Sequence, residues 1–130
     1  GIRKALNFGH TIGHAYESLS FIQERPILHG HAVAAGIVSE LYLSHVMCGF
    51  PMEKVRQVVY YIKEYYPAFG FDCTDYERLY ELMTHDKKNE GGVINFTLLA
   101  QVGDVRINQS VSKARILESL DFYRESMGMQ

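Results

Sequence analysis

The chain lacks the features that mark secreted, membrane and nucleic-acid-binding proteins. It has 2 cysteines in 130 residues, and Cys48 and Cys73 form no C-x-x-C metal pair, which indicates reduced thiols in a cytosol. No apolar run approaches the roughly 20 residues of a membrane span, and we recognise no signal peptide. The 13 basic and 15 acidic side chains leave a net charge of −2, which gives no electrostatic footprint for nucleic acid or an anionic membrane.

Several motifs are also missing. Thr11 follows His10, so the His-Glu-x-x-His pattern of metalloproteases is absent. No strand leads into a glycine-rich phosphate loop, so the chain offers no NAD site of its own. Because Gly1 is preceded by neither a start methionine nor a leader, we expect a fragment of a longer protein.

What the chain does have is a cluster of histidines near its start. His10 and His14 are four residues apart, so on a helix their imidazoles share one face and can point at one cation or one phosphate. Pro26 interrupts that helix, and His29 must therefore come from a second segment. Catalytic zinc sites draw three protein ligands from more than one element. The alternative is that these are ordinary hydrogen-bonded core or surface histidines.

Small and polar residues accompany these histidines. We expect Gly9 and Gly13, which have no side chain, to leave the approach of a ligand unobstructed. Arg3 and Asn7, again four apart, form a weaker pair of donors ahead of the cluster. By spacing alone, Arg3 and Asn7 are equally well explained as an exposed polar stripe with no ligand.

The hydrophobic pattern predicts one mainly α domain over residues 1–130, with five helices and a small β-hairpin near residues 93–108. The first three expected helices cover residues 3–19, from 30 or 31 to 47, and 52–66. A fourth helix is expected to begin after an N-cap at residue 74 or 75. The last is expected to begin after an N-cap at residue 110 or 112 and to end before Gly128. The expected strands are 93–99 and 105–107, joined by a turn at Gly103-Asp104.

Three motifs in this order resemble a known family. They are Arg3-x-x-x-Asn7-x-Gly9-His10-Thr11-x-Gly13-His14-Ala15, then Leu28-His29-Gly30-x-Ala32-Val33, then Asp86-Lys87-Lys88 before a β run. Together they resemble the C-terminal domain of the 3-dehydroquinate synthase family, within the sugar phosphate cyclase superfamily. The resemblance covers nearly the whole chain.

The resemblance implies the multi-helical C-terminal half of a cytoplasmic enzyme of the shikimate pathway, which leads to aromatic amino acids. Such a lyase converts 3-deoxy-D-arabino-heptulosonate 7-phosphate to 3-dehydroquinate and phosphate, with NAD and zinc as cofactors. Its N-terminal NAD-binding domain is absent from this chain, so the fragment is expected to be inactive alone. The implied partners are the sugar phosphate, that missing domain and a second copy in a homodimer, with no nucleic acid or membrane.

The metal ligands that the resemblance implies are His10 and His29, holding Zn²⁺ or another divalent metal. The family's third ligand, a glutamate from the preceding part of the chain, has no match here, and two histidines without it are expected to hold zinc weakly. The family usually has Glu where this chain has His31. That change affects the expected metal affinity and leaves open which sugar phosphate is used.

The substrate residues that the resemblance implies are also polar or basic. His14 matches the histidine near the substrate's phosphate, where it binds the leaving group or assists proton movement. Arg3 and Asn7 match polar substrate contacts. Lys87 and Lys88 match a lysine pair of which at least one reaches the substrate's anionic groups, and with His14 they are the expected catalytic residues. Composition alone favours a solvated charged turn there.

Three alternatives remain. Another cyclase of the superfamily uses a different sugar phosphate. The helical domain of a metal-dependent alcohol or glycerol dehydrogenase also carries spaced histidines, but Asp86-Lys87-Lys88 argues against it because an uncharged polyol has no phosphate to hold. Finally, a free-standing helical binding module would use the histidines structurally.

Overall fold

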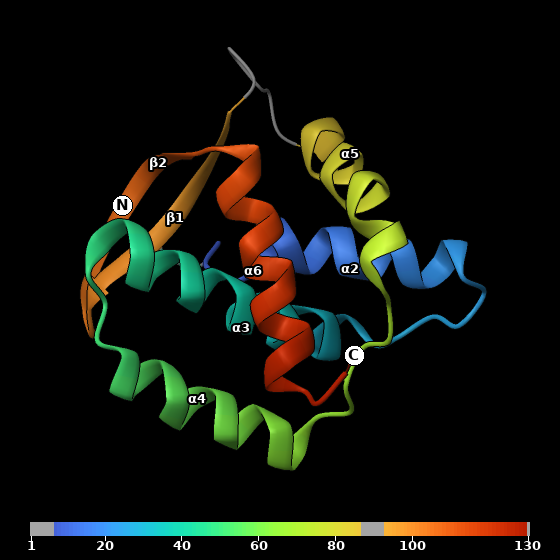
Figure 1. The fold of residues 1–130 in the computed structure, drawn as a ribbon, viewed down its shortest axis with the longest axis horizontal. Helices are drawn as coiled ribbons and strands as arrows, with labels where there is room; N and C mark the ends of the chain where they lie inside the picture. Colours follow the sequence, from blue (N-terminus) through green and yellow to red (C-terminus); the bar gives the residue numbers. More distant parts are fainter. Residues whose placement is uncertain (1–6, 87–92, 130) are drawn as a thin grey trace.

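The computed structural model describes residues 7–86 and 93–129. Its elements follow in the order α2 (His10–Ile22), α3 (His29–Cys48), α4 (Met52–Tyr65), a 3₁₀ turn η1 (Cys73–Asp75), α5 (Tyr76–Asp86), β1 (Ile94–Gln101), β2 (Asp104–Val111) and α6 (Lys113–Ser126) (Figure 1). Within the described ranges, this confirms the predicted mainly α fold of five helices and one hairpin. Arg3, Lys87 and Lys88 lie outside the described residues.

Helix α3 lies at the centre of the fold, where it packs against α2, α4, α6 and β1. Its first half is built from small buried residues, namely Ala32, Ala34, Ala35 and Gly36. Larger apolar residues such as Leu41 and Leu43 fill its second half. A helix that is apolar on most of its circumference is stable only when other elements surround it. Figure 1 shows α3 running back alongside α2, with α6 packed across α3.

The hairpin closes one end of the molecule. Its strands pair antiparallel from Ile94 opposite Val111 to Gln101 opposite Asp104, with Gly103 (φ 83°) in the connecting turn. Strand β1 packs on α3, and β2 is the outer strand whose side chains are mostly exposed. Because an exposed outer strand needs little apolar alternation, the sequence predicted only residues 105–107 of β2.

The start of α2 corrects the sequence-based expectation. A helix from Arg3 was predicted, but residues 7–9 form turns and α2 begins at His10. Gly9 has a φ of 85°, a left-handed conformation that a continuous right-handed helix does not allow. Asn7 therefore precedes the helix in an exposed turn and does not share a helical face with His10.

The starts of α5 and α6 are set by short polar caps. Asp72, not the predicted Thr74 or Asp75, accepts the Thr74 N–H at 2.8 Å, and the Asp75 carboxylate accepts the Asp72 N–H at 3.0 Å. This capping box forms η1, so α5 begins only at Tyr76. One of the two predicted caps of α6 is confirmed, because the Ser112 hydroxyl accepts the Arg115 N–H at 3.3 Å.

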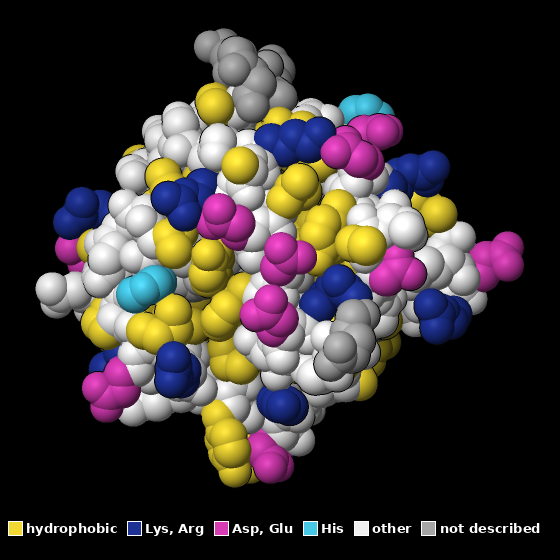
Figure 2. Space-filling view, in the orientation of Figure 1, with side chains coloured by type: hydrophobic (Ala, Val, Ile, Leu, Met, Phe, Trp, Pro, Cys, Tyr) yellow, Lys and Arg dark blue, Asp and Glu magenta, His cyan; other side chains and the backbone are white. Residues whose placement is uncertain are grey.

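The surface carries no large region of one charge on the face shown in Figure 2, where Lys and Arg alternate with Asp and Glu between small apolar areas. In the described part of the chain, no helix combines the length and apolar character needed to cross a membrane.

Candidate metal centre

Helix α2 places the first two histidines of the site. The rings of His10 and His14 lie on one helical face, 5.4 Å apart between centroids and nearly perpendicular. Both side chains are half-buried. The predicted shared face at a spacing of four residues is therefore confirmed.

Helix α3 supplies the third histidine. His29 is its first residue, and its ring centroid lies 5.9 Å from that of His10 and 5.8 Å from that of His14. One ring nitrogen from each histidine lies within 4.8 Å of the others. Zinc–nitrogen bonds of about 2.0–2.1 Å put tetrahedral ligands about 3.3 Å apart, so small side-chain rotations suffice to close the group on an ion. The three imidazoles fit a divalent transition metal.

Hydrogen bonds on the far side of two rings set their orientation. Nδ1 of His10 donates to the Phe8 carbonyl at 3.2 Å, and Nδ1 of His29 donates to the Glu17 carboxylate at 2.9 Å. Because both partners are acceptors, Nδ1 carries a proton, and in the neutral imidazole Nε2 then has its lone pair available for a ligand. Metal-binding histidines have this arrangement, in which an oxygen fixes the tautomer and raises the basicity of the ligand nitrogen.

The first turn of α2 is held by a carboxylate from α3. Glu40 is fully buried, and its two oxygens accept the Gly9 N–H at 2.8 Å and the Ile12 N–H at 2.9 Å. Helix N-termini leave such amides without intrahelical partners and attract negative charge. The Glu40 carboxylate therefore occupies the N-terminus of the helix that carries His10 and His14.

Three glycines let α2 and α3 approach this closely. A Cβ atom on Gly36 would lie 2.1 Å from the Gly9 carbonyl oxygen and 2.5 Å from the Gly13 nitrogen, and one on Gly13 would lie 3.1 Å from the Ala32 carbonyl oxygen. The expectation that Gly9 and Gly13 leave room for a ligand is wrong, because both are buried against α3. Their function is to bring the two helix backbones together.

A hydrogen-bonded chain of hydroxyls further joins these helices to α6. Tyr16 of α2 donates to the Ser39 hydroxyl at 2.7 Å, and Ser39 donates to the Ser119 carbonyl at 3.1 Å. Burial raises the pKa of the Tyr16 phenol well above its ordinary value. The phenol therefore stays neutral and fixes the rotation of α2 under the histidines.

His31 does not belong to the cluster. Its ring packs edge-on against Tyr66 at 5.6 Å between centroids, and it is absent from the group of nitrogens around His10. His31 therefore contacts the residue that follows α4.

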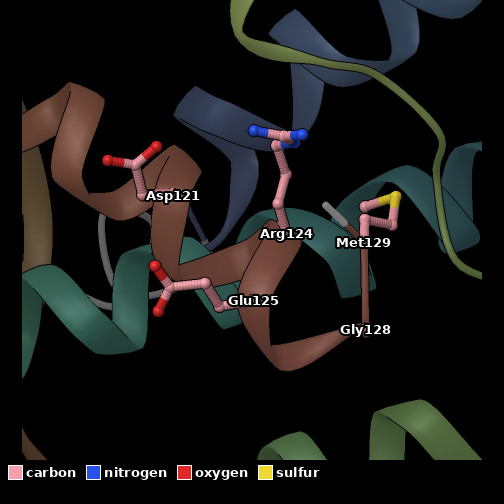
Figure 3. Close-up of a pocket in the computed structure, with 5 residues that line it drawn as sticks. All are labelled: Asp121, Arg124, Glu125, Gly128 and Met129. Atoms are coloured by element: carbon pink, nitrogen blue, oxygen red, sulfur yellow. The ribbon is translucent and has the colours of Figure 1, made fainter.

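A hollow at the end of α6 is separate from the histidine cluster. It is lined by Asp121, Arg124, Glu125, Gly128 and Met129 (Figure 3). Figure 3 shows the charged side chains of α6 standing around it. None of the predicted site residues lines it, so it does not extend the candidate metal centre.

Sequence reasoning missed Glu17 and Glu40. The small residues Ala32, Ala34, Ala35 and Gly36 did predict close helix packing, but not that Gly36 meets Gly9 and Gly13. Glu17 had no visible signal, because its partner His29 lies 12 residues away on another helix. Glu40 had one, since it is the single charged residue between Ala32 and Ser44. A lone carboxylate in an apolar helix must find buried donors.

Comparison with known proteins agrees with the resemblance found in the sequence motifs. The family described as 3-dehydroquinate synthase C-terminal matches residues 1–89. The chain is 84% identical over 129 residues to a 3-dehydroquinate synthase from Parabacteroides distasonis, covering 99% of this chain and 36% of that protein. It is 37% identical over 105 residues to one from Staphylococcus aureus, covering 81% of this chain and 28% of that protein.

A solved structure shares the fold. The crystal structure of 2-deoxy-scyllo-inosose synthase complexed with carbaglucose-6-phosphate, NAD⁺ and Co²⁺ superposes with a TM-score of 0.69 at 25% identity, over 92% of this chain and 32% of that one. The chain thus spans about a third of the length of the proteins it matches. By the family match and the shared fold, this chain belongs to the 3-dehydroquinate synthase C-terminal family.

Proposed function

We propose that this chain is the helical catalytic half of a 3-dehydroquinate synthase, which converts 3-deoxy-D-arabino-heptulosonate 7-phosphate to 3-dehydroquinate and phosphate in the shikimate pathway. The observation that carries the proposal is the convergence of His10, His14 and His29 in a chain 84% identical over 129 residues to an enzyme of that name. Activity requires the rest of the protein, which supplies the NAD site, and the fragment alone is inactive.

In this proposal His10 and His29 hold a divalent metal, Zn²⁺ in the first instance. The ion, when bound, polarises the substrate oxygen that is oxidised and later reduced, which is Lewis-acid catalysis. The Phe8 carbonyl and the Glu17 carboxylate hold the two rings with Nε2 available. The structure of 2-deoxy-scyllo-inosose synthase, which contains Co²⁺, supports a divalent metal in this fold.

His14 is assigned to the substrate's phosphate end. Its ring lies beside both proposed ligands, so it can donate a hydrogen bond to the departing phosphate or transfer a proton there. Its nitrogen is also close enough to serve as a third metal ligand, and the experiment below separates the two roles. Arg3, Asn7, Lys87 and Lys88 are proposed to bind the substrate's carboxylate, hydroxyl and phosphate oxygens.

The remaining proposals concern the whole protein. NAD bound by the preceding domain supplies reversible hydride transfer, and the carbaglucose-6-phosphate and NAD⁺ in the related synthase support this combination of ligands. We further propose a cytoplasmic enzyme that acts as a homodimer, binding a small sugar phosphate and neither nucleic acid nor membrane.

The test is phosphate release from 3-deoxy-D-arabino-heptulosonate 7-phosphate by the full-length protein, with NAD and Zn²⁺ present. His10→Ala is expected to lose both bound zinc and phosphate release. His14→Ala is expected to keep zinc and to slow release by about 10²- to 10⁴-fold, the usual contribution of a general acid or base. His31→Ala, whose ring packs on Tyr66 outside the cluster, is the matched control and should retain both.

Three results would change the assignment. Zinc loss in His14→Ala would make His14 a metal ligand. Undiminished release by His10→Ala would contradict the metal site. No release by a folded, zinc-loaded wild type would favour another sugar phosphate cyclase, the alternative that the shared fold with 2-deoxy-scyllo-inosose synthase supports. Glucose 6-phosphate, the sugar counterpart of the carbaglucose-6-phosphate in that structure, is the first substrate to try next.

A further inference from the structure

The N-terminus of α2 is capped from another helix. Its N-cap residue is Gly9, which has no side chain to bond the first-turn amides. Glu40, 31 residues later on α3, accepts the Gly9 N–H and the Ile12 N–H, one on each carboxylate oxygen. Ordinary caps are local serine, threonine, aspartate or asparagine side chains that accept one amide. A buried carboxylate that accepts two amides across 31 residues is a long-range connection between helices.

The two hydrogen bonds to Glu40 lie on either side of His10, the first proposed metal ligand. His10 lies between Gly9 and Ile12 in the sequence, so the two hydrogen bonds to Glu40 fix the backbone on both sides of it. The His10 ring is then held through its bond to the Phe8 carbonyl, just before Gly9. Movement of this turn therefore moves the His10 ring.

The other end of the connection lies on the helix of the second proposed ligand. His29 is the first residue of α3 and Glu40 is three turns further along it. Between them, Gly36 contacts the backbone of Gly9 and Gly13, which brings the Glu40 carboxylate within reach of α2. A single carboxylate thus joins the turn that carries His10 to the helix that carries His29.

We propose that Glu40 is a positioning residue of the metal centre, which sets the separation of His10 from His29 by fixing the first turn of α2 to α3. The inference rests on the proposed metal site and adds a residue that touches neither metal nor substrate. It also means that the N-terminus of α2 is filled by a protein carboxylate, so the substrate's phosphate binds elsewhere in the site.

The test is the Zn²⁺ affinity of the full-length protein, measured by calorimetric titration for Glu40→Gln and the wild type. Glutamine keeps the size of the side chain but has one acceptor oxygen, so one of the two amides loses its partner. Loss of an outer partner of a metal ligand weakens binding by about 10- to 100-fold, and we expect a decrease in this range.

The matched control is Ser44→Ala. Ser44 lies one turn beyond Glu40 on α3 and is equally buried. Its hydroxyl donates to the Glu40 backbone carbonyl at 2.8 Å and accepts the Leu99 N–H of β1 at 3.0 Å, so the variant removes bonds of the α3 backbone and of β1 and keeps the Glu40 carboxylate. Loss of the hydroxyl lowers stability without touching α2, so zinc affinity should stay within about twofold of the wild type. Equal weakening in Ser44→Ala would show a general stability effect and overturn the positioning role.

A second measurement needs no variant. Zinc binding to the wild type should slow hydrogen exchange of the Gly9 and Ile12 amides more than that of amides in α4, because ligand and cap stabilise the same turn. Unchanged exchange at these two amides, or a Glu40→Gln affinity within about twofold of the wild type, would overturn the inference alone. A folded wild type that binds no zinc would overturn the proposed metal site together with it.

Discussion

Substituting Gly36 with alanine should separate α2 from α3 and disturb the candidate metal centre. The added Cβ would lie 2.1 Å from the Gly9 carbonyl oxygen, 2.5 Å from the Gly13 nitrogen and 2.7 Å from the Gly13 Cα. Real Cβ atoms essentially never come within 3.0 Å of such neighbours, so the first contact alone requires a displacement of about 0.9 Å. All three neighbours are backbone atoms, which no side-chain rotation can move away.

The magnitude follows from two opposing effects. Alanine favours a helix over glycine by about 1 kcal/mol, whereas overpacking a well-packed contact costs about 1–3 kcal/mol and occasionally more. Because the clash is with backbone, we expect the upper end and a net loss of about 2 kcal/mol in the free energy of unfolding. Zinc affinity should fall as well, because α2 carries His10 and α3 carries His29, and moving the two helices apart adds to the rotation that the rings need to meet on one ion.

The assay is urea unfolding followed by circular dichroism, with Gly30→Ala as the matched control. Gly30 lies in the first turn of the same helix, and a Cβ there would meet nothing within 4 Å. This control should be as stable as the wild type or up to about 1 kcal/mol more stable. If Gly36→Ala unfolded within about 0.5 kcal/mol of the wild type, the close backbone contact between α2 and α3 would be refuted.

Two further predictions concern single contacts. Glu17→Ala removes the acceptor of the His29 Nδ1 proton and should weaken Zn²⁺ binding by about 10- to 100-fold in a calorimetric titration. The control is Glu64→Ala, which removes an exposed carboxylate on α4 and should leave Zn²⁺ affinity unchanged. Equal affinities of the two variants would contradict the orienting role of Glu17. Burial and the hydrogen bond to Asp121 raise the pKa of Tyr76 to about 12. Between about pH 10 and 12 the folded state therefore binds more protons than the unfolded state, and the free energy of unfolding should decline as the pH rises. Urea unfolding across that range should show a shallower decline for Tyr76→Phe, and an identical slope would exclude Tyr76 as a contributor.

Features that depend on neighbours in the sequence could be predicted from the sequence. His10 and His14 share a face because helix geometry alone places residues four apart together. Helix α3 was expected to within one or two residues at each end, since its apolar length and Gly49 at its C-terminus are local signals. The convergence of His29 with them was only partly predictable, because Pro26 shows that a new segment starts but not where it leads.

The residues that meet at the contact between helices could not be predicted. The small residues around Gly36 predict close helix packing, but the sequence does not show that Gly36 lies against Gly9 and Gly13. The extension of the first helix to Arg3 was wrong for a related reason. Gly9 adopts a φ of 85°, and the approach of α3 leaves room for glycine there but not for a side chain.

The contacts along α3 explain how this chain can prepare a metal site. His29, Gly36 and Glu40 meet α2 in reverse order along its length: His29 contacts Glu17, Gly36 contacts Gly13 and the turn before it, and Glu40 binds the first amides. The two helices are therefore antiparallel, and the N-terminus of each is bound to the middle of the other, with the glycine contact between these two points. Because every one of these contacts lies within this chain, the separation of the proposed ligands is set before any third ligand arrives. A further ligand then adds affinity and charge to a pair of imidazoles that is already in place.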